Sequence, residues 1–224
     1  MNTSSPRVLR TVLLQECYEL DDGVILGYAP ARPISDVTLW IGPGARIRSG
    51  TVIYGGSAIG PGLETGHNVV IREENIIGAN CSIWNNSVID YGCVIGDRVK
   101  IHCGVYVAQF TTIEDEVFIA PGVTIANDPH PVCGLCMRGP TLKRRARIGV
   151  NVTLLPRITI GEAALIGAGS VVTKDIPEYT VAYGNPARVV GSVNELRCAR
   201  GIVENPYFNG LDAKAQQVLS RSEL

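Results

Sequence analysis

The sequence predicts an all-β solenoid, in which short strands and tight corners repeat along one axis. An aliphatic residue returns at every sixth position, a period that suits neither an amphipathic helix nor a half-buried flat strand. Small residues, glycine, asparagine and aspartate fill the places between, as corners require. The repeating aliphatic residues are Ile41, Ile47, Ile53, Ile59, Ile71, Ile77, Ile83, Ile89, Ile95, Ile101, Val107, Ile113, Ile119, Ile125, Ile148, Leu154, Ile160, Ile166 and Val172. Only Thr65 breaks the first run.

Residues 1–40 precede the repeat, and we expect them to form an N-terminal β cap. Two strands are predicted within residues 8–29, on either side of the turn sequence Asp21-Asp22-Gly23. A cap of this kind shields the first strand edge of the solenoid, which would otherwise invite aggregation.

Residues 41–190 form the predicted solenoid domain. Burying one Val, Leu or Ile contributes about 1.5 to 3 kcal/mol, and chain entropy offsets most of that gain, so single coils are stable only when stacked. Ile148 follows Ile125 by 23 residues, one short of four hexads. The sequence therefore predicts a loop inserted over residues 127–147, and a repeat that breaks its own rule usually does so for function.

Residues 191–224 are expected to form a C-terminal helical segment. Ser192 and Glu195 have the spacing of a capping box, which begins a helix. Leu211, Ala215 and Val218 fall at helical spacing further on. Two short helices are predicted to close the solenoid.

Composition is that of one soluble domain. The chain has 224 residues, 46% hydrophobic content and a formal net charge of -1, which argues against a general nucleic-acid binder. No apolar run approaches the roughly 18 residues of a membrane span, and a cytoplasmic location is expected. The seven cysteines are expected to be reduced, with Cys81 and Cys93 packed inward.

The hexad pattern resembles that of the left-handed parallel β-helix proteins with hexapeptide repeats. This resemblance implies the left hand, a triangular section with three hexads in each coil, and about seven coils. It covers about 140 residues and is much more specific for the fold than for the substrate.

The break and the end of the repeat resemble acetyltransferases of the maltose, galactoside and nodulation-factor type. The stretch APGVTIANDPHP, residues 120–131, matches their segment with a catalytic His-Pro pair, which implies that His130 is a general base. IGAGSVVTKDIP and YGNPARVV match their coenzyme end. The resemblance implies that Ala168, Thr173, Lys174 and Arg188 bind acetyl-CoA as the cosubstrate.

These assignments agree with the chemistry of the side chains. Coenzyme A is anionic at its nucleotide end, where Lys174 and Arg188 can supply cations. An attacking amine or hydroxyl must lose a proton, and imidazole accepts one near neutral pH. Asn127 and Asp128 can orient the imidazole or hydrogen-bond the acceptor. No donor to the developing oxyanion can be named from the sequence.

A second resemblance points to the acceptor. The stretches around Arg72 and Glu73, around His102, and around Asn127 and Asp128 are similar, in this order, to N-acetyltransferases of nucleotide-linked 3-amino or 2-acetamido-3-amino sugars. It implies substrate binding by Arg72, Glu73 and Asp128. His102 stands where that family more commonly has Gln, and its outward-turning place after Ile101 makes it the second catalytic candidate, with Asn127. Some members of that family lack the histidine, and the leaving coenzyme A thiolate takes the proton instead.

We therefore expect a homotrimeric, acetyl-CoA-dependent N-acetyltransferase of an amino sugar, with no metal required. An O-acetyltransferase of a sugar or serine-like hydroxyl and an antibiotic acetyltransferase are the nearest alternatives. A γ-type carbonic anhydrase needs a closely spaced histidine pair that this chain lacks, and a purely structural solenoid would not explain the coenzyme motifs. Three weaker features stay open. His67 is expected at the surface or in trimer packing, the basic run 143–147 is either solvated or phosphate-binding, and Cys133-x-x-Cys136 lacks the second pair typical of zinc sites.

Overall fold

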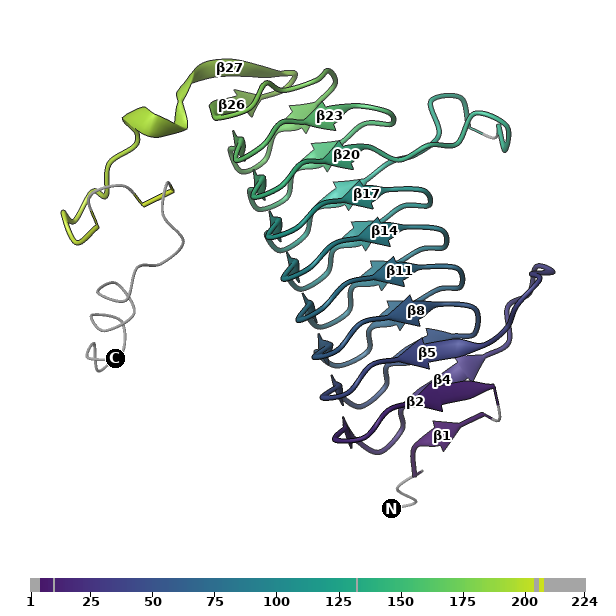
Figure 1. Cartoon of the computed structure of the whole chain (residues 1–224). Helices are drawn as coiled ribbons and strands as arrows, with labels where there is room; N and C mark the ends of the chain where they lie inside the picture. The colour runs from purple at the N-terminus through teal and green to yellow at the C-terminus, as the bar shows by residue number, and fades with distance from the viewer. Residues whose placement is uncertain (1–4, 10, 132, 204–205, 208–224) are drawn as a thin grey trace.

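The fold is a left-handed parallel β-helix, as predicted, built from three sheets that form the faces of a stacked coil (Figure 1). The computed structural model describes residues 5–9, 11–131, 133–203 and 206–207. Within these residues the strands of each sheet are parallel, except for the terminal pair β26 and β27. We call the faces sheets A, B and C, and the corners between them the A–B, B–C and C–A edges.

The strands are mostly two or three residues long. Sheet A contains β1 (Arg7–Val8), β4 (Ile25–Tyr28), β7 (Val52–Tyr54), β10 (Val70–Ile71), β13 (Val88–Ile89), β16 (Tyr106–Val107), β19 (Thr124–Ile125), β22 (Thr153–Leu154) and β25 (Val171–Val172). Sheet B contains β2 (Val12–Leu14), β5 (Leu39–Ile41), β8 (Ala58–Ile59), β11 (Ile76–Ile77), β14 (Val94–Ile95), β17 (Thr112–Ile113), β20 (Thr141–Leu142) and β23 (Thr159–Ile160). Sheet C contains β3 (Glu19–Leu20), β6 (Arg46–Ile47), β9 (Glu64–Thr65), β12 (Ser82–Ile83), β15 (Lys100–Ile101), β18 (Phe118–Ile119), β21 (Arg147–Ile148), β24 (Leu165–Ile166), β26 (Thr180–Gly184) and β27 (Ala187–Ser192).

Each coil stacks in register on the next, so that equivalent residues are 18 positions apart through most of the solenoid. In sheet A, for example, Ile71 lies beside Ile53 on one side and Ile89 on the other. The repeating aliphatic residues point inward and are buried in one continuous core. Every coil adds such residues to the same columns, so the residues that repeat every six positions in the sequence make up the core.

Thr65, which breaks the sequence pattern, also occupies a buried inward position. Its hydroxyl accepts a hydrogen bond from the backbone N–H of Arg48 at 3.0 Å, and Thr51 bonds the carbonyl of Gly66 at 3.2 Å. The polar substitution therefore satisfies backbone groups at this corner of the core, where a buried unpaired donor would cost free energy.

Strands are present on either side of Asp21-Asp22-Gly23, as predicted, but β3 and β4 do not pair with each other. β1, β2 and β3 pair in parallel with β4, β5 and β6, respectively, so this segment already follows the coil. Asp21, Asp22 and Gly23 form a corner between sheets C and A, with Gly23 at φ 78°. A turn sequence of the Asp-Gly type suits a solenoid corner as well as a hairpin, and here it forms the corner.

The solenoid also resumes earlier after its break than the predicted loop boundary at residue 147. β20 places Leu142 in the core, paired with Ile113 of β17 and Ile160 of β23. Leu142 is therefore the first inward residue after the break, six positions before Ile148. The inserted loop covers residues 126–140.

At the C-terminus, Ser192 caps a single 3-10 turn, η1 (Val193–Glu195), with both hydrogen bonds of the predicted capping box present. The first predicted helix is thus reduced to this short turn. The second, around residues 211–219, lies outside the described residues. In the part of the chain that the structure describes, no helix is long and apolar enough to span a membrane.

The return from the loop to the solenoid depends on the small size of Gly139, which is buried. A Cβ atom there would lie 2.7 Å from the Cα of Thr111 and 2.8 Å from its nitrogen, so the backbone would have to shift. A Cβ atom at Gly134, in the same loop, would meet nothing within 4 Å.

We predict that Gly139→Ala lowers the free energy of unfolding by about 1 to 3 kcal/mol, the usual cost of forcing extra atoms into a packed site. Gly134→Ala is the matched control and should leave stability within experimental error. Denaturant unfolding of both variants measures the difference. Equal midpoints for the two would contradict the close packing of Gly139.

Candidate functional site

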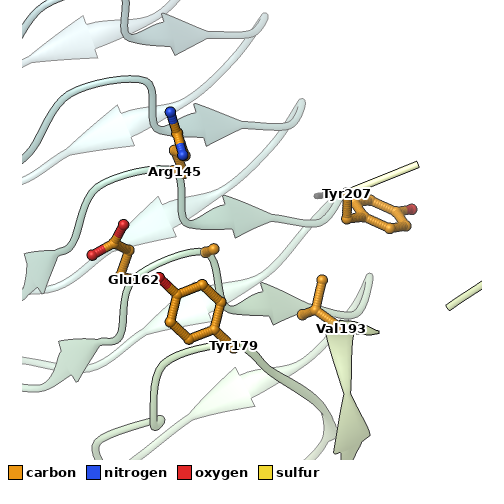
Figure 2. A pocket seen from close by; sticks show the side chains of 6 residues that line it. Arg145, Glu162, Tyr179, Val193 and Tyr207 are labelled. Atoms are coloured by element: carbon orange, nitrogen blue, oxygen red, sulfur yellow. The ribbon is translucent and has the colours of Figure 1, made fainter. Parts of the chain in front are cut away.

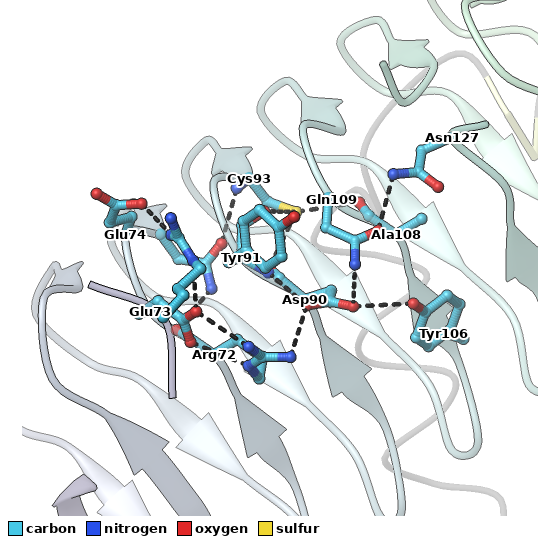
Figure 3. Close-up of polar contacts among 12 residues, drawn as sticks. Arg72, Glu73, Glu74, Asp90, Tyr91, Cys93, Tyr106, Ala108, Gln109 and Asn127 are labelled. Atoms are coloured by element: carbon cyan, nitrogen blue, oxygen red, sulfur yellow. Dashed lines mark hydrogen bonds and ion pairs between the residues drawn. The ribbon is translucent and has the colours of Figure 1, made fainter. Parts of the chain in front are cut away.

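The A–B edge carries both long excursions from the coil. Residues 29–38 leave the solenoid between β4 and β5, and residues 126–140 leave it between β19 and β20. Both project from the same side of the molecule, several coils apart (Figure 1). The corners between them contain a connected group of polar side chains, drawn in Figure 3. We call this group the polar edge.

One end of the polar edge is an ion-pair cluster around Glu73, whose side chain is 0% exposed. Arg32, from the first excursion, donates to Glu73 at 2.7 Å and also pairs with Glu74. Arg72 donates to both oxygens of Glu73 at 3.0 Å. Burial alone would raise the pKa of Glu73, but these donors outweigh it and hold that pKa below its ordinary value. Glu73 is therefore a buried carboxylate that positions two arginines.

Asp90 connects this cluster with the next coils, and its exposure is only 6%. Its carboxylate accepts hydrogen bonds from Arg72 Nη1 at 3.3 Å, the Tyr106 hydroxyl at 2.9 Å and Gln109 Nε2 at 2.6 Å. The Arg32 guanidinium lies over the Tyr91 ring, 4.2 Å from its centroid, and covers the cluster.

The other end of the polar edge reaches the inserted loop. Asn127 Nδ2 donates to Gln109 Oε1 at 2.8 Å, and the backbone carbonyl of Asn127 accepts from the N–H of Arg138 at 2.8 Å. Within the described residues, Asn127 Oδ1 receives no hydrogen bond. A fixed amide whose oxygen has no protein donor is suited to bind an N–H or O–H group of a ligand.

The carboxylate of Asp128 accepts hydrogen bonds from the backbone at the beginning of the loop. One oxygen accepts from the backbone N–H of His130 at 2.8 Å and the other from the N–H of Cys133 at 2.8 Å. These two backbone donors, chiefly that of Cys133, lower the pKa of Asp128. Asp128 is thus ionised and occupied with the loop backbone, and His130 is exposed beyond it.

His102, the other predicted catalytic histidine, lies on a different edge. It follows β15 on the C–A edge, where its ring packs against Phe118 with centroids 5.0 Å apart. Sheet A separates this edge from the loop that carries His130. A single chain therefore does not bring the two histidines together. His67 is on the C–A edge too, exposed, with Nδ1 2.8 Å from the Ser49 hydroxyl.

The predicted coenzyme residues are also divided between two edges. Thr173 and Lys174 follow β25 on the A–B edge, beyond the inserted loop. Ala168 is exposed on the C–A edge after β24. Arg188 is the second residue of the return strand β27. The turn that precedes this strand packs on the same corner through a 3.1 Å hydrogen bond from Gly184 N to Ser170 Oγ.

The basic run after the loop is engaged in ion pairs on the B–C edge. Lys143 bonds Glu114 at 2.7 Å, and Arg144 and Arg145 each bond Glu116 at 2.9 Å. The hydrogen bonds from Arg144 and Arg145 lower the pKa of Glu116 to about 2. These contacts join the re-entering coil to the preceding one.

A small pocket at the C-terminal end of the B–C edge, shown in Figure 2, contains none of the predicted site residues. Its lining residues are Arg145, Glu162, Ala163, Tyr179, Val193 and Tyr207. The polar edge remains the better candidate because it joins sequence-predicted residues to the inserted loop.

Several members of the polar edge were not singled out from the sequence, among them Arg32, Asp90, Tyr106 and Gln109. Asp90 lies 18 positions after Arg72, and Asn127 lies 18 positions after Gln109. Each pair is therefore visible in the sequence as two polar residues separated by the 18 positions of one coil. Arg32 gave no such signal because it lies on an excursion.

Family comparisons agree with the repeat. A model described as bacterial transferase hexapeptide (six repeats) matches residues 92–127. A second, described as hexapeptide repeat of succinyl-transferase, matches residues 74–109 and 144–174. The resemblance seen in the sequence is thereby confirmed: over these residues the repeats are similar to those of hexapeptide transferases.

Three curated relatives show the range of acceptors among similar proteins. The chain is 44% identical over 91 residues to a galactoside O-acetyltransferase of Escherichia coli (strain K12), which covers 38% of this chain and 45% of the relative. It is 47% identical over 64 residues to a dTDP-3-amino-3,6-dideoxy-alpha-D-galactopyranose 3-N-acetyltransferase of Aneurinibacillus thermoaerophilus. This match covers 29% of this chain and 33% of the relative. It is 37% identical over 92 residues to serine acetyltransferase 4 of Arabidopsis thaliana, covering 41% and 25%. The chain thus spans less than half the length of each relative.

Among solved structures, a polySia specific acetyltransferase has a TM-score of 0.47 at 22% identity, covering 80% of this chain and 81% of the other. An Arabidopsis UDP-N-acetylglucosamine acyltransferase has a TM-score of 0.47 at 19% identity, covering 80% and 74%. Likenesses of this extent do not distinguish one acceptor from another.

The hydrogen bond between Tyr106 and Asp90 affects the pKa of Tyr106. Burial, and then the hydrogen bond to the Asp90 carboxylate, raise the pKa of Tyr106 to about 12. A raised pKa means that this contact stabilises the fold fully below the ordinary tyrosine pKa of about 10, and that its contribution is lost as the pH rises through about 12.

We predict that Asp90→Asn moves the pKa of Tyr106 down from about 12 toward the ordinary value, because the hydrogen-bonded anion is gone while burial remains. Ultraviolet titration of phenolate measures it, with Tyr106→Phe identifying the signal. A Tyr106 titration that does not change in Asp90→Asn would disprove the contact.

Proposed function

We propose that this chain, whose repeats are similar to those of hexapeptide transferases, is an acetyl-CoA-dependent N-acetyltransferase of an amino sugar, most specifically a nucleotide-linked 3-amino or 2-acetamido-3-amino sugar. The observation that carries this proposal is the polar edge, which runs from Arg72 to Asn127. Residues 72–73 and 127–128 are the stretches that resemble sugar N-acetyltransferases, and the structure links them through Asp90 and Gln109. The similarity to a 3-amino-sugar N-acetyltransferase supports the same acceptor class.

The acceptor is proposed to lie along the polar edge. Arg32 and Arg72 are 33% and 29% exposed, and each is held by the carboxylate of Glu73. Such guanidinium groups suit the phosphates of a nucleotide-linked sugar. Asn127 Oδ1 would then accept a hydrogen bond from the sugar amine. Glu73 acts by positioning the two arginines and Asp128 by holding the loop backbone at His130 and Cys133, because the oxygens of both carboxylates are bonded to these protein donors.

The proposed reaction joins the amine nitrogen to the thioester carbonyl carbon of acetyl-CoA. A tetrahedral oxyanion forms, the C–S bond breaks, and coenzyme A leaves as the thiolate. The nitrogen must also lose a proton, which one ring nitrogen of His130 can accept. The leaving thiolate is the second possible acceptor, and the two routes differ in their dependence on His130.

A homotrimer would explain why the predicted residues lie on two edges. Three-fold closure uses one interface repeatedly, so the A–B edge of one chain can face the C–A edge of the next. His130, Thr173 and Lys174 would come from one copy, and His102, Ala168 and Arg188 from its neighbour. The active site is proposed to be shared in this way.

We predict that the protein releases coenzyme A thiol when acetyl-CoA is mixed with a nucleotide-linked 3-amino sugar, and that His130→Ala lowers kcat by about 10² to 10⁴-fold. Gly134→Ala is the matched control, in the same loop at a position where an added Cβ meets nothing within 4 Å, and should retain full turnover. A decrease below about tenfold would assign the proton to the thiolate.

The acceptor panel should include sugars with a hydroxyl in place of the amine, since the galactoside O-acetyltransferase is among the relatives. Faster transfer to the hydroxyl sugars would replace the N-acetyltransferase proposal by O-acetyl transfer. No thiol release with any acceptor would contradict the acetyltransferase activity itself.

The shared site predicts complementation between two inactive variants. His130→Ala removes the base on the A–B edge, and Ala168→Trp places a bulky side chain at the exposed coenzyme corner on the C–A edge. Random co-assembly of equal amounts should restore about a quarter of wild-type sites, because each site draws one edge from each of two chains. Thiol release from co-expressed and separately purified variants measures this. No recovery in verified mixed trimers would place each site within one chain.

A further inference from the structure

The inserted loop brings together three side chains that are typical metal ligands. One ring nitrogen of His130 and the Sγ atoms of Cys133 and Cys136 all lie within 4.8 Å of one another. These residues come from the one segment where the solenoid is interrupted. The sequence showed only a lone Cys-x-x-Cys, and the structure adds the histidine as a third donor.

The loop backbone holds these donors in place. Asp128 accepts from the backbone N–H groups of both His130 and Cys133, which bends the chain so that their side chains face one another. The N–H of Cys136 donates to the carbonyl of Cys133 at 3.0 Å. Arg157, from the following coil, donates to the carbonyl of Cys136 at 2.9 Å. The arrangement is therefore fixed by contacts that do not involve the thiols or the imidazole.

The donor set and spacing suit a soft divalent cation. Zinc binds thiolate sulfur at about 2.3 Å and imidazole nitrogen at about 2.0 to 2.1 Å, so that tetrahedral ligands lie roughly 3.5 to 3.8 Å apart. Donors that already lie within 4.8 Å need only small side-chain rotations to reach this spacing. Two thiolates neutralise a divalent charge. The exposed position of His130 leaves the fourth coordination position accessible to water or another small ligand.

We propose that His130, Cys133 and Cys136 form a binding site for one zinc-like divalent cation. The site follows from the loop alone and does not rest on the proposed acetyl transfer. A disulfide between the two cysteines would use the same thiols, but it would give the imidazole no role. Because three donors converge, metal binding explains the arrangement better than a disulfide does. Oxidation of the two thiols to a disulfide would abolish metal binding.

Metal binding has a direct consequence for His130. A neutral imidazole carries one proton and one lone pair, and coordination uses the lone pair. A metal-bound His130 therefore cannot accept a proton from an acceptor amine. Occupancy of the site and base catalysis by His130 exclude one another, so the bound cation would act as a reversible inhibitor of the base-dependent route.

The site can be tested by titrating the full-length, reduced protein with Co²⁺, which reports thiolate coordination by a charge-transfer absorption band. We expect one equivalent of Co²⁺ to produce the band and Zn²⁺ to displace it. Cys133→Ser and Cys136→Ser should lose the band. Cys103→Ser, which removes an exposed cysteine on the C–A edge, is the matched control and should retain it.

His130→Ala should bind with lower affinity and an altered band, since thiolates alone remain. Circular dichroism of each variant establishes that the solenoid is folded. Absence of a stoichiometric band in the reduced wild type, or an unchanged band in Cys133→Ser, would overturn the proposal. Failure of acetyl transfer leaves these spectra unaffected, so the metal site and the proposed function can fail separately.

Discussion

In-register stacking of one coil on the next is the constraint on which the rest of this molecule depends. Most strands contain two or three residues, too few to be stable alone, and they are held by the equivalent strands of adjacent coils, which lie 18 positions away through most of the solenoid. An inserted residue within a coil would turn inward side chains outward. Extra residues can therefore be accommodated only at corners, and both long excursions do leave the solenoid at corners of the A–B edge.

The same register builds the polar edge. Arg72 and Asp90 are equivalent residues of adjacent coils, as are Gln109 and Asn127, and each pair is joined by a side-chain hydrogen bond. The core and the site thus follow one rule with different residue types: aliphatic residues stack inside each face, and polar residues stack along one corner. Because Asp90 is nearly buried and bonded to several donors, the position of Asn127 depends on residues two coils away.

The sequence was sufficient to predict the solenoid, because an aliphatic period of six residues extends over most of the chain. It was less reliable where the pattern is locally ambiguous. Asp21-Asp22-Gly23 forms a corner and not a hairpin. Leu142 is six positions before Ile148 and thus in phase with the repeat, but a single aliphatic residue directly after a long break does not by itself mark where the repeat resumes. Of the site, the sequence indicated Arg72, Glu73, Asn127 and His130. It could not place Arg32, or show that His102 lies across sheet A from His130, because such relations depend on how the chain winds.

The separation of the two excursions has a further consequence. They leave sheet A after β4 and β19, which are five strand steps apart. At about 4.8 Å for each step, the solenoid holds the bases of the two loops roughly 24 Å apart. Deleting one whole coil would shorten this distance by a single step and leave the pattern of buried residues unchanged. The number of coils between the two excursions therefore sets the distance between them. That distance in turn sets the length of a ligand that could contact both loops at once.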